Sequence, residues 1–307
     1  MVESDWLAKQ FEQNRSHLRA VAYRMLGSLS DADDAIQETW LRLSRSDAGE
    51  IENLGGWLTT VLSRVCLDML RSRTSRREDI LGGQPEPAAN RDSHTNPERE
   101  ALLADSVGVA LLVVLDRLDP AERLAFVLHD IFGMSFGDIA GILDRTPAAA
   151  RQLASRARRR VQGAEATAID SRRQQSRVVN AFLAALRAGD FAGLVAVLDP
   201  DLVVRVDEYS GRPGAPREIH GAETWARSAV VFAQTVQFAA EAALLDGAAG
   251  VIWAPAGQLR RVLKLTIADG RISQIEIVGD PARLRELEIA VLDPANVGDT
   301  GDEGSVE

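Results

Sequence analysis

The segment from Asp119 to Val161 contains a series of helix-start signals, and it constrains the fold more than any other part of the chain. Ser135, with an acid three residues later, has the pattern of a capping box at the start of a short helix. Thr146 followed by Pro147 has the pattern of the N-cap and first residue of a second helix. Because only the turn Leu143–Arg145 lies between the two helices, the sequence predicts a helix-turn-helix.

The second of these helices has two chemically different faces. Alanine, leucine and valine side chains face inward, while the outer face carries arginine, glutamine and serine. Arginine and glutamine form paired hydrogen bonds with guanine and adenine, and further arginines contact phosphates. The sequence therefore predicts a DNA-binding surface made of Arg151, Gln152, Ser155, Arg156 and Arg159.

The N-terminal part of the chain is also predicted to be helical. One helix begins at Ser30, which forms a capping box with Asp33, and apolar residues at helical spacing define its buried face. The opposite face is polar except for Leu41, which marks a place where a partner helix could dock. A further helix, at residues 56–73, presents a polar row outward: Arg64, Asp68 and Arg71.

Composition divides the chain into ordered blocks and polar segments. Two helical blocks are separated by a stretch rich in proline, glycine, asparagine and charge, which predicts a linker. The C-terminal part combines helices with alternating strands, and Asp269-Gly270 has the pattern of a hairpin turn. The fold class is therefore multidomain, with two all-α domains followed by an α+β domain. The predicted boundaries are 6–77, a linker at 78–99, 100–163, 171–290, and a flexible acidic tail at 291–307.

The net charge of −10 by itself disfavours a nucleic acid as partner. The acidity is concentrated near the C-terminus, where residues 178–307 hold 11 Lys/Arg against 19 Asp/Glu, a net of −8. Two basic clusters remain, at residues 64–77 and 145–177. We therefore expect low DNA affinity for the chain alone and useful affinity only within a larger assembly.

The cysteines, the histidines, the apolar runs and the N-terminus of the sequence exclude several classes of protein. A single cysteine, Cys66, excludes an internal disulfide, and four scattered histidines without ligand spacing predict a metal-free protein. No apolar run approaches the roughly 18 residues of a membrane helix. The N-terminus also lacks the pattern of a signal peptide. The sequence predicts a cytoplasmic protein with no cofactor and no membrane association.

The motifs resemble those of a known family. GSLSDADDAIQETWLRL and GGWLTTVLSRVCLDMLRSR resemble region 2 of the sigma-70 family, of the extracytoplasmic-function (ECF) type. LDPAERLAFVLHDIFGMSFGDIAGILDRTPAAARQLASRARRRV resembles region 4, and the two follow in the family's order over nearly the whole chain to Val161. With its C-terminal domain the chain is similar to the SigJ-type group, whose members carry a SnoaL-like extension. The resemblance implies a promoter-reading subunit of RNA polymerase and no enzyme.

The resemblance also implies a role for each matching position. The helix from Thr146 would read the minus-35 promoter element, and region 4 would rest on the β flap of the polymerase. The minus-35 contacts are Arg145, Thr146, Arg151, Gln152, Ser155, Arg156 and Arg159. The minus-10 contacts are Asn53, Trp57, Arg64, Asp68 and Arg71. The residues for the clamp helices of the β′ subunit are Asp33, Asp34, Gln37, Glu38 and Leu41.

The C-terminal domain fits a SnoaL-like cone, an open cavity that could hold a small-molecule or peptide ligand. Asp207 begins the counterpart of a DGGGK-like loop of relatives, although the glycine run is missing here. Asp280 and Pro281 begin the counterpart of an NPDKL-like motif. The predicted regulatory residues of the cone are Asp207, His220, Asp280 and Pro281, and the cone is expected to modulate transcription.

Two alternatives from other classes stay open. In an enzyme, acid–base groups would line the cone, and turnover of a ligand would distinguish this alternative. The candidate groups are Asp207, Glu208, His220 and Glu276. In a one-component transcriptional regulator, the helix-turn-helix would bind a promoter without polymerase while the cone binds a ligand. That reading leaves the helices of residues 6–77 and their docking face unexplained.

Overall fold

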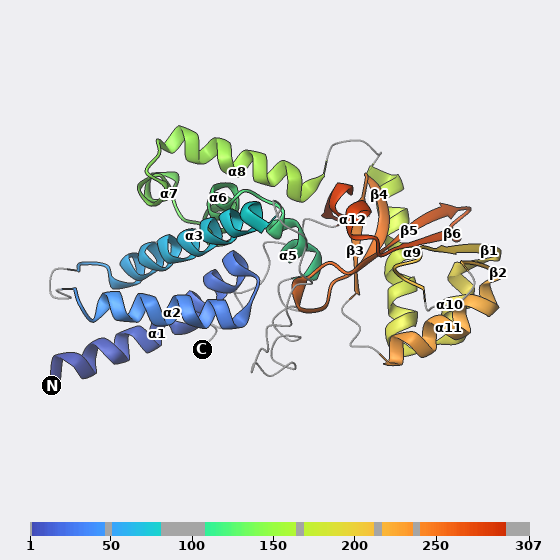
Figure 1. Cartoon of the computed structure of the whole chain (residues 1–307), viewed down its shortest axis with the longest axis horizontal. Coiled ribbons are helices and arrows are strands. Elements are labelled where there is room, and N and C mark those ends of the chain that lie inside the picture. The colour runs from blue at the N-terminus through green and yellow to red at the C-terminus, as the bar shows by residue number, and fades with distance from the viewer. Residues whose placement is uncertain are drawn as a thin grey trace, which may run out of the picture. The chain divides into compact units, whose positions relative to one another are not determined.

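The computed structural model describes residues 2–46, 51–80, 108–163, 169–211, 217–235 and 240–292 (Figure 1). These residues form two compact units, which are described separately. The first lies within Met1–Leu102 and Leu115–Arg158, and the second within Leu103–Val114 and Arg159–Glu307. Most of the predicted linker at 78–99 and nearly all of the tail at 291–307 fall outside the described residues.

Three long helices begin the first unit: α1 (Val2–Leu26), α2 (Leu29–Leu43) and α3 (Leu54–Ile80). α1 ends at Gly27, whose φ of 71° is the left-handed conformation that glycine adopts at helix ends. The predicted capping box at Ser30 is wrong, because Ser28 is the N-cap and its side chain accepts a hydrogen bond from the Asp31 amide. The predicted inner face of α2 is confirmed for Ala32, Ala35, Ile36, Thr39 and Leu43, which are buried, whereas Trp40 on the same face is only half-buried.

The predicted helix-turn-helix is confirmed in the same unit. It consists of α6 (Pro120–Phe126), a π-helical turn η2 (Val127–Ile131), α7 (Phe136–Leu143) and α8 (Pro147–Gln162). The Ser135 hydroxyl accepts a hydrogen bond from the Asp138 amide at 3.2 Å, and Thr146 caps α8 through the Ala149 amide at the same distance. Asp144 ends α7 in a left-handed conformation, with φ of 53°. The sequence did not predict the π turn.

The second unit is built on a mixed seven-stranded sheet in the order β2-β1-β6-β5-β4-β3-β7. The strands are β1 (Leu198–Val206), β2 (Glu218–His220), β3 (Ala240–Leu245), β4 (Ala248–Trp253), β5 (Arg261–Ala268), β6 (Arg271–Val278) and β7 (Ile289–Val291). All neighbours are antiparallel except β1 and β6, which run parallel. The predicted Asp269-Gly270 turn is confirmed by φ of 50° and 76°.

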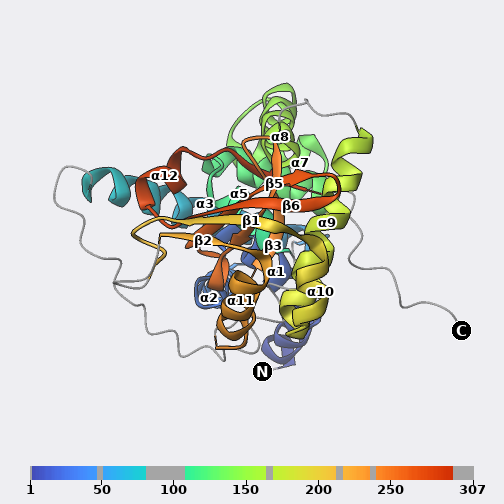
Figure 2. The same ribbon diagram turned by 90° about the vertical axis from the view of Figure 1, so that its right-hand side faces the viewer.

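Helices cover the sheet of the second unit. α10 (Phe191–Val197) packs against α9 (Ile169–Ala188), α11 (Ala222–Thr235) and the strand β1 (Figure 2). α5 (Val109–Asp116) contributes its first six residues to this unit, where the Ala110 amide donates to the Glu241 carboxylate at 2.6 Å. The short elements β2, β7 and α12 (Pro281–Glu286) were not predicted.

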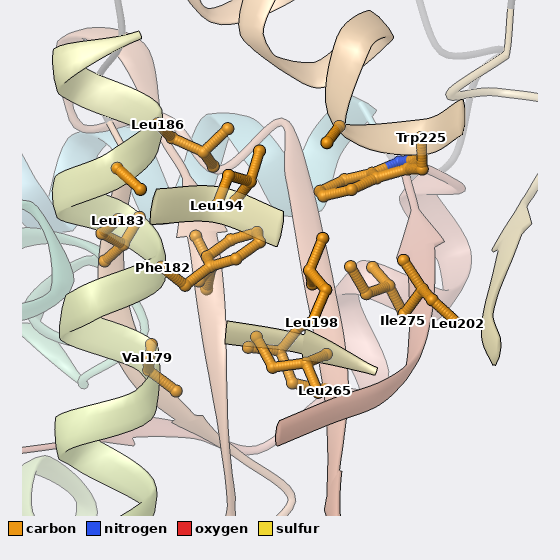
Figure 3. Packing of buried hydrophobic residues seen from close by; sticks show 14 of the residues in the cluster. Val179, Phe182, Leu183, Leu186, Leu194, Leu198, Leu202, Trp225, Leu265 and Ile275 are labelled. Atoms are coloured by element: carbon orange, nitrogen blue, oxygen red, sulfur yellow. The ribbon is translucent and has the colours of Figure 1, made fainter. Parts of the chain in front are cut away.

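The space between the helices and the sheet is occupied by a hydrophobic core (Figure 3). Phe182 is completely buried and stacks on Trp225 with ring centroids 5.8 Å apart. Leucine, valine and isoleucine side chains from β1, β4, β5 and β6 complete the cluster. These buried side chains pack against one another, and the open cavity of the cone stays a prediction.

Candidate nucleic-acid interface

The outer face of α8 is the most polar exposed helix surface of the helix-turn-helix. Ala150, Ala154 and Ala157 are buried on the inner face, so small side chains let the preceding helix approach closely. The predicted DNA contacts lie on the opposite side. Arg145, Thr146, Arg151, Gln152, Ser155, Arg156 and Arg159 are all exposed.

The arginines of this surface differ in their surroundings. Arg156 pairs with Glu122, a carboxylate that is only 5% exposed, at 3.1 Å. Arg158 donates to Asp130 at 2.8 Å. Because both pairs hold α8 against the preceding helices, these two side chains have a structural role in the unit. In the described part of the chain, Arg159 has no such partner and is free to reach a ligand.

Arg151 has an aromatic partner instead of an acid. Its guanidinium lies over the ring of Phe136, 5.2 Å from the ring centroid. The same ring stacks on His129, with centroids 3.8 Å apart. The sequence reasoning missed both rings, because an aromatic residue at the start of a short helix carries no signal of this contact.

A second polar row lies on α3. Arg64, Asp68 and Arg71 are exposed as predicted, and Trp57 is half-buried. The exposed Asn53 caps α3, its side-chain oxygen accepting from the Gly56 amide at 3.0 Å. The predicted minus-10 residues therefore follow one helix and its N-cap.

Two residues of this row also meet the helix-turn-helix. Arg64 donates to the Gly141 carbonyl in α7 at 2.9 Å. Arg71 lines an open cleft of about 460 Å³ together with Arg156, Glu122 and Leu153. In the first unit, the row on α3 therefore contacts the helix-turn-helix, and one residue of each predicted promoter surface lines the same cleft.

The outer face of α2 carries the residues predicted to bind polymerase. Asp33, Asp34 and Gln37 are exposed, Glu38 is half-buried, and Leu41 has 38% of its side-chain surface exposed. Asp33 accepts a hydrogen bond from Arg19 at 3.0 Å, and Glu38 accepts one from Arg42 at 2.9 Å. Leu41 is therefore an exposed apolar side chain on an otherwise polar face of α2.

Arg123 was missed by the sequence reasoning and is the most deeply buried cation of the first unit's described residues, only 2% exposed. It lies in α6 and donates two hydrogen bonds, of 3.1 and 3.2 Å, to the Arg24 carbonyl near the end of α1. Burial lowers the pKa of Arg123 to about 10, against the opposing effect of Asp116. The side chain therefore stays charged at neutral pH and joins the helix-turn-helix to α1.

The predicted regulatory residues of the second unit have local partners. The Asp207 carboxylate accepts hydrogen bonds from the Ser210, Gly279 and Asp280 amides at 2.7–2.9 Å. Burial raises the pKa of Asp207, but the hydrogen bonds lower it by more than burial raises it. The pKa therefore lies below its ordinary value. Asp280 caps α12 with Pro281 as its first residue. Asp207 and Asp280 thus tie the end of β6 to neighbouring turns.

The acid–base groups of the enzyme alternative each pair with a different neighbour. His220 lies 2.9 Å from Glu218, Glu208 pairs with Arg217, and Glu276 pairs with Arg283. The residues described include no group of three or more side chains able to hold a metal ion. None of the helices that the structure describes has the length and apolar character to cross a membrane.

Comparison with known proteins identifies the family. Residues 10–76 match the model of sigma-70 region 2, and residues 108–161 match that of sigma-70 region 4. The chain is 36% identical to the ECF RNA polymerase sigma factor SigJ of Mycobacterium tuberculosis, over 89% of this chain and 91% of the relative. It is 35% identical to the probable ECF sigma factor SigI of the same organism, over 94% and 98%.

Among solved structures, the chain resembles the crystal structure of Mycobacterium tuberculosis SigJ, to which it is 33% identical. The match covers 91% of this chain and 98% of the other, with a TM-score of 0.42. The two matched regions and the near full-length relatives do not favour the one-component regulator. The chain belongs to the ECF RNA polymerase sigma factors, which direct core RNA polymerase to promoters.

Proposed function

We propose that this sigma factor divides its task among three surfaces. The outer face of α8 reads the minus-35 element, α3 with its N-cap Asn53 captures the minus-10 element, and the outer face of α2 binds the β′ clamp helices. The observation that carries the proposal is the exposed polar face of α8 on a capped helix-turn-helix. That geometry suits insertion of α8 into a major groove.

The α8 surface supplies both kinds of DNA contact. Arg151 and Gln152 lie in the N-terminal half of the helix, where recognition helices contact base edges. A good bidentate contact discriminates against the wrong base by about 1–3 kcal/mol. Arg159 lies further along the helix and serves phosphates. The α3 row supplies fewer cations, and the acid Asp68 lies between Arg64 and Arg71, so α3 alone gives weak duplex affinity.

The α2 surface fits a protein partner better than DNA. Its acids repel phosphates, and Leu41 offers an apolar contact at its centre. Removing a leucine side chain from water contributes about 1.5–3 kcal/mol when it is fully buried. We propose that this contact anchors region 2 to the clamp helices while region 4 rests on the β flap.

The proposed reading of both elements requires the first unit to open. The two elements lie about 25 base pairs apart, roughly 85 Å along B-form DNA. Arg64 on α3 and Gly141 on α7 are joined at 2.9 Å, so their surfaces cannot occupy both elements while this contact persists. The exposed Arg64 bond costs only about 1 kcal/mol to break. Separating the buried Arg123 from the Arg24 carbonyl costs more, and we propose that binding to core polymerase supplies that energy.

For the second unit we propose modulation of this opening. Asp207, Asp280 and Pro281 organise turns next to β6, and His220 lies exposed on the edge strand β2. Because His220 is exposed, we propose that the unit acts through a surface contact. Removing the unit and removing only α12 and β7 should change transcript yield differently; equal yields from both truncations and the full chain would refute modulation.

The test of promoter reading is run-off transcription with purified core polymerase and the full chain. Initiation from a cognate promoter should depend on the protein and fall about tenfold or more in Arg151→Ala. The control is Arg227→Ala, which removes an exposed arginine of α11 whose ion pair with Glu223 is equally exposed. Equal loss in both variants, or tight promoter binding without polymerase, would overturn the proposal.

A further inference from the structure

Three elements of the helix-turn-helix meet at the ring of Phe136. His129 comes from η2, Phe136 is the first residue of α7, and Arg151 comes from α8. The ring of Phe136 contacts the other two side chains, with separations of 3.8 Å to the imidazole centroid and 5.2 Å to the guanidinium carbon. Arg151, which we propose to read a base, is therefore linked through the ring of Phe136 to His129 in η2.

The ring of Phe136 has a rigid support. His129 Nδ1 lies 2.9 Å from the Met134 carbonyl, and because a carbonyl only accepts, Nδ1 carries the proton. The neighbouring Ser135 and Asp138 bond each other twice, through the capping bond and through their side chains at 2.6 Å. The π turn that holds His129 adds a residue to the helix and so changes the direction of the side chains that follow. These contacts fix the position of Phe136 before any DNA is bound.

Arg151 needs such support because it is exposed and long. A free arginine side chain samples many rotamers and must lose that freedom to form a bidentate contact with one base. A guanidinium within about 6 Å of an aromatic centroid is held by the electrostatic attraction of the ring face. At an exposed site this attraction changes an equilibrium by about twofold to fivefold.

We propose that Phe136 is a positioning residue for promoter recognition. Its ring holds the Arg151 guanidinium near the orientation required at one base pair of the minus-35 element, and thereby sets the base preference there. Phe136 touches no base itself. The inference rests on the proposed role of Arg151 in reading that element.

The experiment measures holoenzyme affinity for promoters carrying each of the four bases at each minus-35 position. Phe136→Leu keeps an apolar side chain but removes the ring, and it should reduce the preference at one position by about twofold to fivefold. Phe136→Tyr keeps the ring face and should retain the preference. Affinity for unrelated duplex and its salt dependence should stay unchanged, since the phosphate contacts remain.

A double-mutant cycle separates positioning from packing. If Phe136 acts through Arg151, Phe136→Leu should have no further effect on base preference in the Arg151→Ala background. Equal effects in both backgrounds, or a loss at every position together with a lower melting temperature, would show a packing role and overturn the inference. If Arg151→Ala leaves base preference unchanged, the proposed reading role itself fails. If only Phe136→Leu leaves it unchanged, the positioning role alone fails.

Discussion

The outer face of α8 and the sheet of the second unit hold their exposed arginines in different ways. On α8, Arg151 rests on a ring and Arg159 has no acidic partner in the described structure, so their donors remain available. In the second unit, exposed arginines pair with nearby carboxylates: Arg205 with Glu218, Arg217 with Glu208 and Arg283 with Glu276. Charge at the surface therefore does not identify an interface. On α8, an arginine held in place by a ring rather than by an acid, as Arg151 is, is the better candidate for a DNA contact.

The largest effect is expected when a core side chain of the second unit is shortened. Phe182→Ala removes a fully buried ring and should destabilise that unit by about 3–5 kcal/mol. Hydrogen exchange should accelerate in β1 and β6 but not in α7 and α8. Val231→Ala, at a side chain 61% exposed, is the control and should stay within about 0.5 kcal/mol. Acceleration in both units would show that they unfold together.

A smaller effect is expected at the polymerase surface of the first unit. Leu41→Asp should weaken binding to core polymerase by about 1–3 kcal/mol, because the apolar contact of the exposed part of Leu41 is lost and an unpaired carboxylate takes its place. The melting temperature should barely change, since Leu41 is not part of the core. Leu41→Met keeps the apolar contact and should bind normally. Normal binding by Leu41→Asp, measured by fluorescence anisotropy, would remove α2 from the interface.

The next prediction concerns Arg123, the buried arginine of the first unit. Arg123→Met keeps most of the volume but leaves the Arg24 carbonyl without its donor, which should cost about 1–3 kcal/mol. Chemical denaturation followed through hydrogen exchange in α1 and α6 measures this. The comparison variant Arg145→Met alters an exposed arginine of the same unit and should be neutral. A neutral Arg123→Met would show that apolar packing alone joins the helices.

The smallest effect is expected at Asp207. Its native pKa is depressed, so its stabilising contribution is present above its ordinary pKa of 3.8 and is lost as pH falls through the lower native value. Asp207→Asn should therefore destabilise the second unit by about 1 kcal/mol at pH 7. The difference between wild type and variant should shrink as pH falls below 3.8 and disappear below the depressed native pKa of Asp207. A difference that persists at acid pH would mean that shape, rather than charge, is recognised by the three amides.

Local signals allowed much of the fold to be predicted. The caps at Ser135 and Thr146, the turn at Asp144 and the Asp269-Gly270 hairpin each depend on residues adjacent in sequence, and all were confirmed. The start of α2 was misplaced because serines occur at both 28 and 30, and the pattern does not distinguish them. Three-residue strands such as β2 and β7 are too short to show a period.

The candidate site was predictable only where exposure follows from helical periodicity. The outer faces of α8, α3 and α2 are such cases. The contacts of Arg64 with Gly141 and of Arg123 with Arg24 join residues 77 and 99 positions apart, and no local pattern encodes them. Filling of the core between the helices and the sheet likewise depends on side chains from many distant elements.

The parallel pairing of β1 with β6 has a consequence during protein synthesis. Most of the second unit lies between these strands in the chain, so its central pairing forms only after the ribosome has passed residue 278. The helix-turn-helix is complete where α8 ends, at Gln162. At about 5–20 residues per second, the remainder of the chain takes roughly 7–30 s to synthesise. A newborn molecule thus passes through a period in which the helices proposed to read promoters exist before the unit proposed to modulate them.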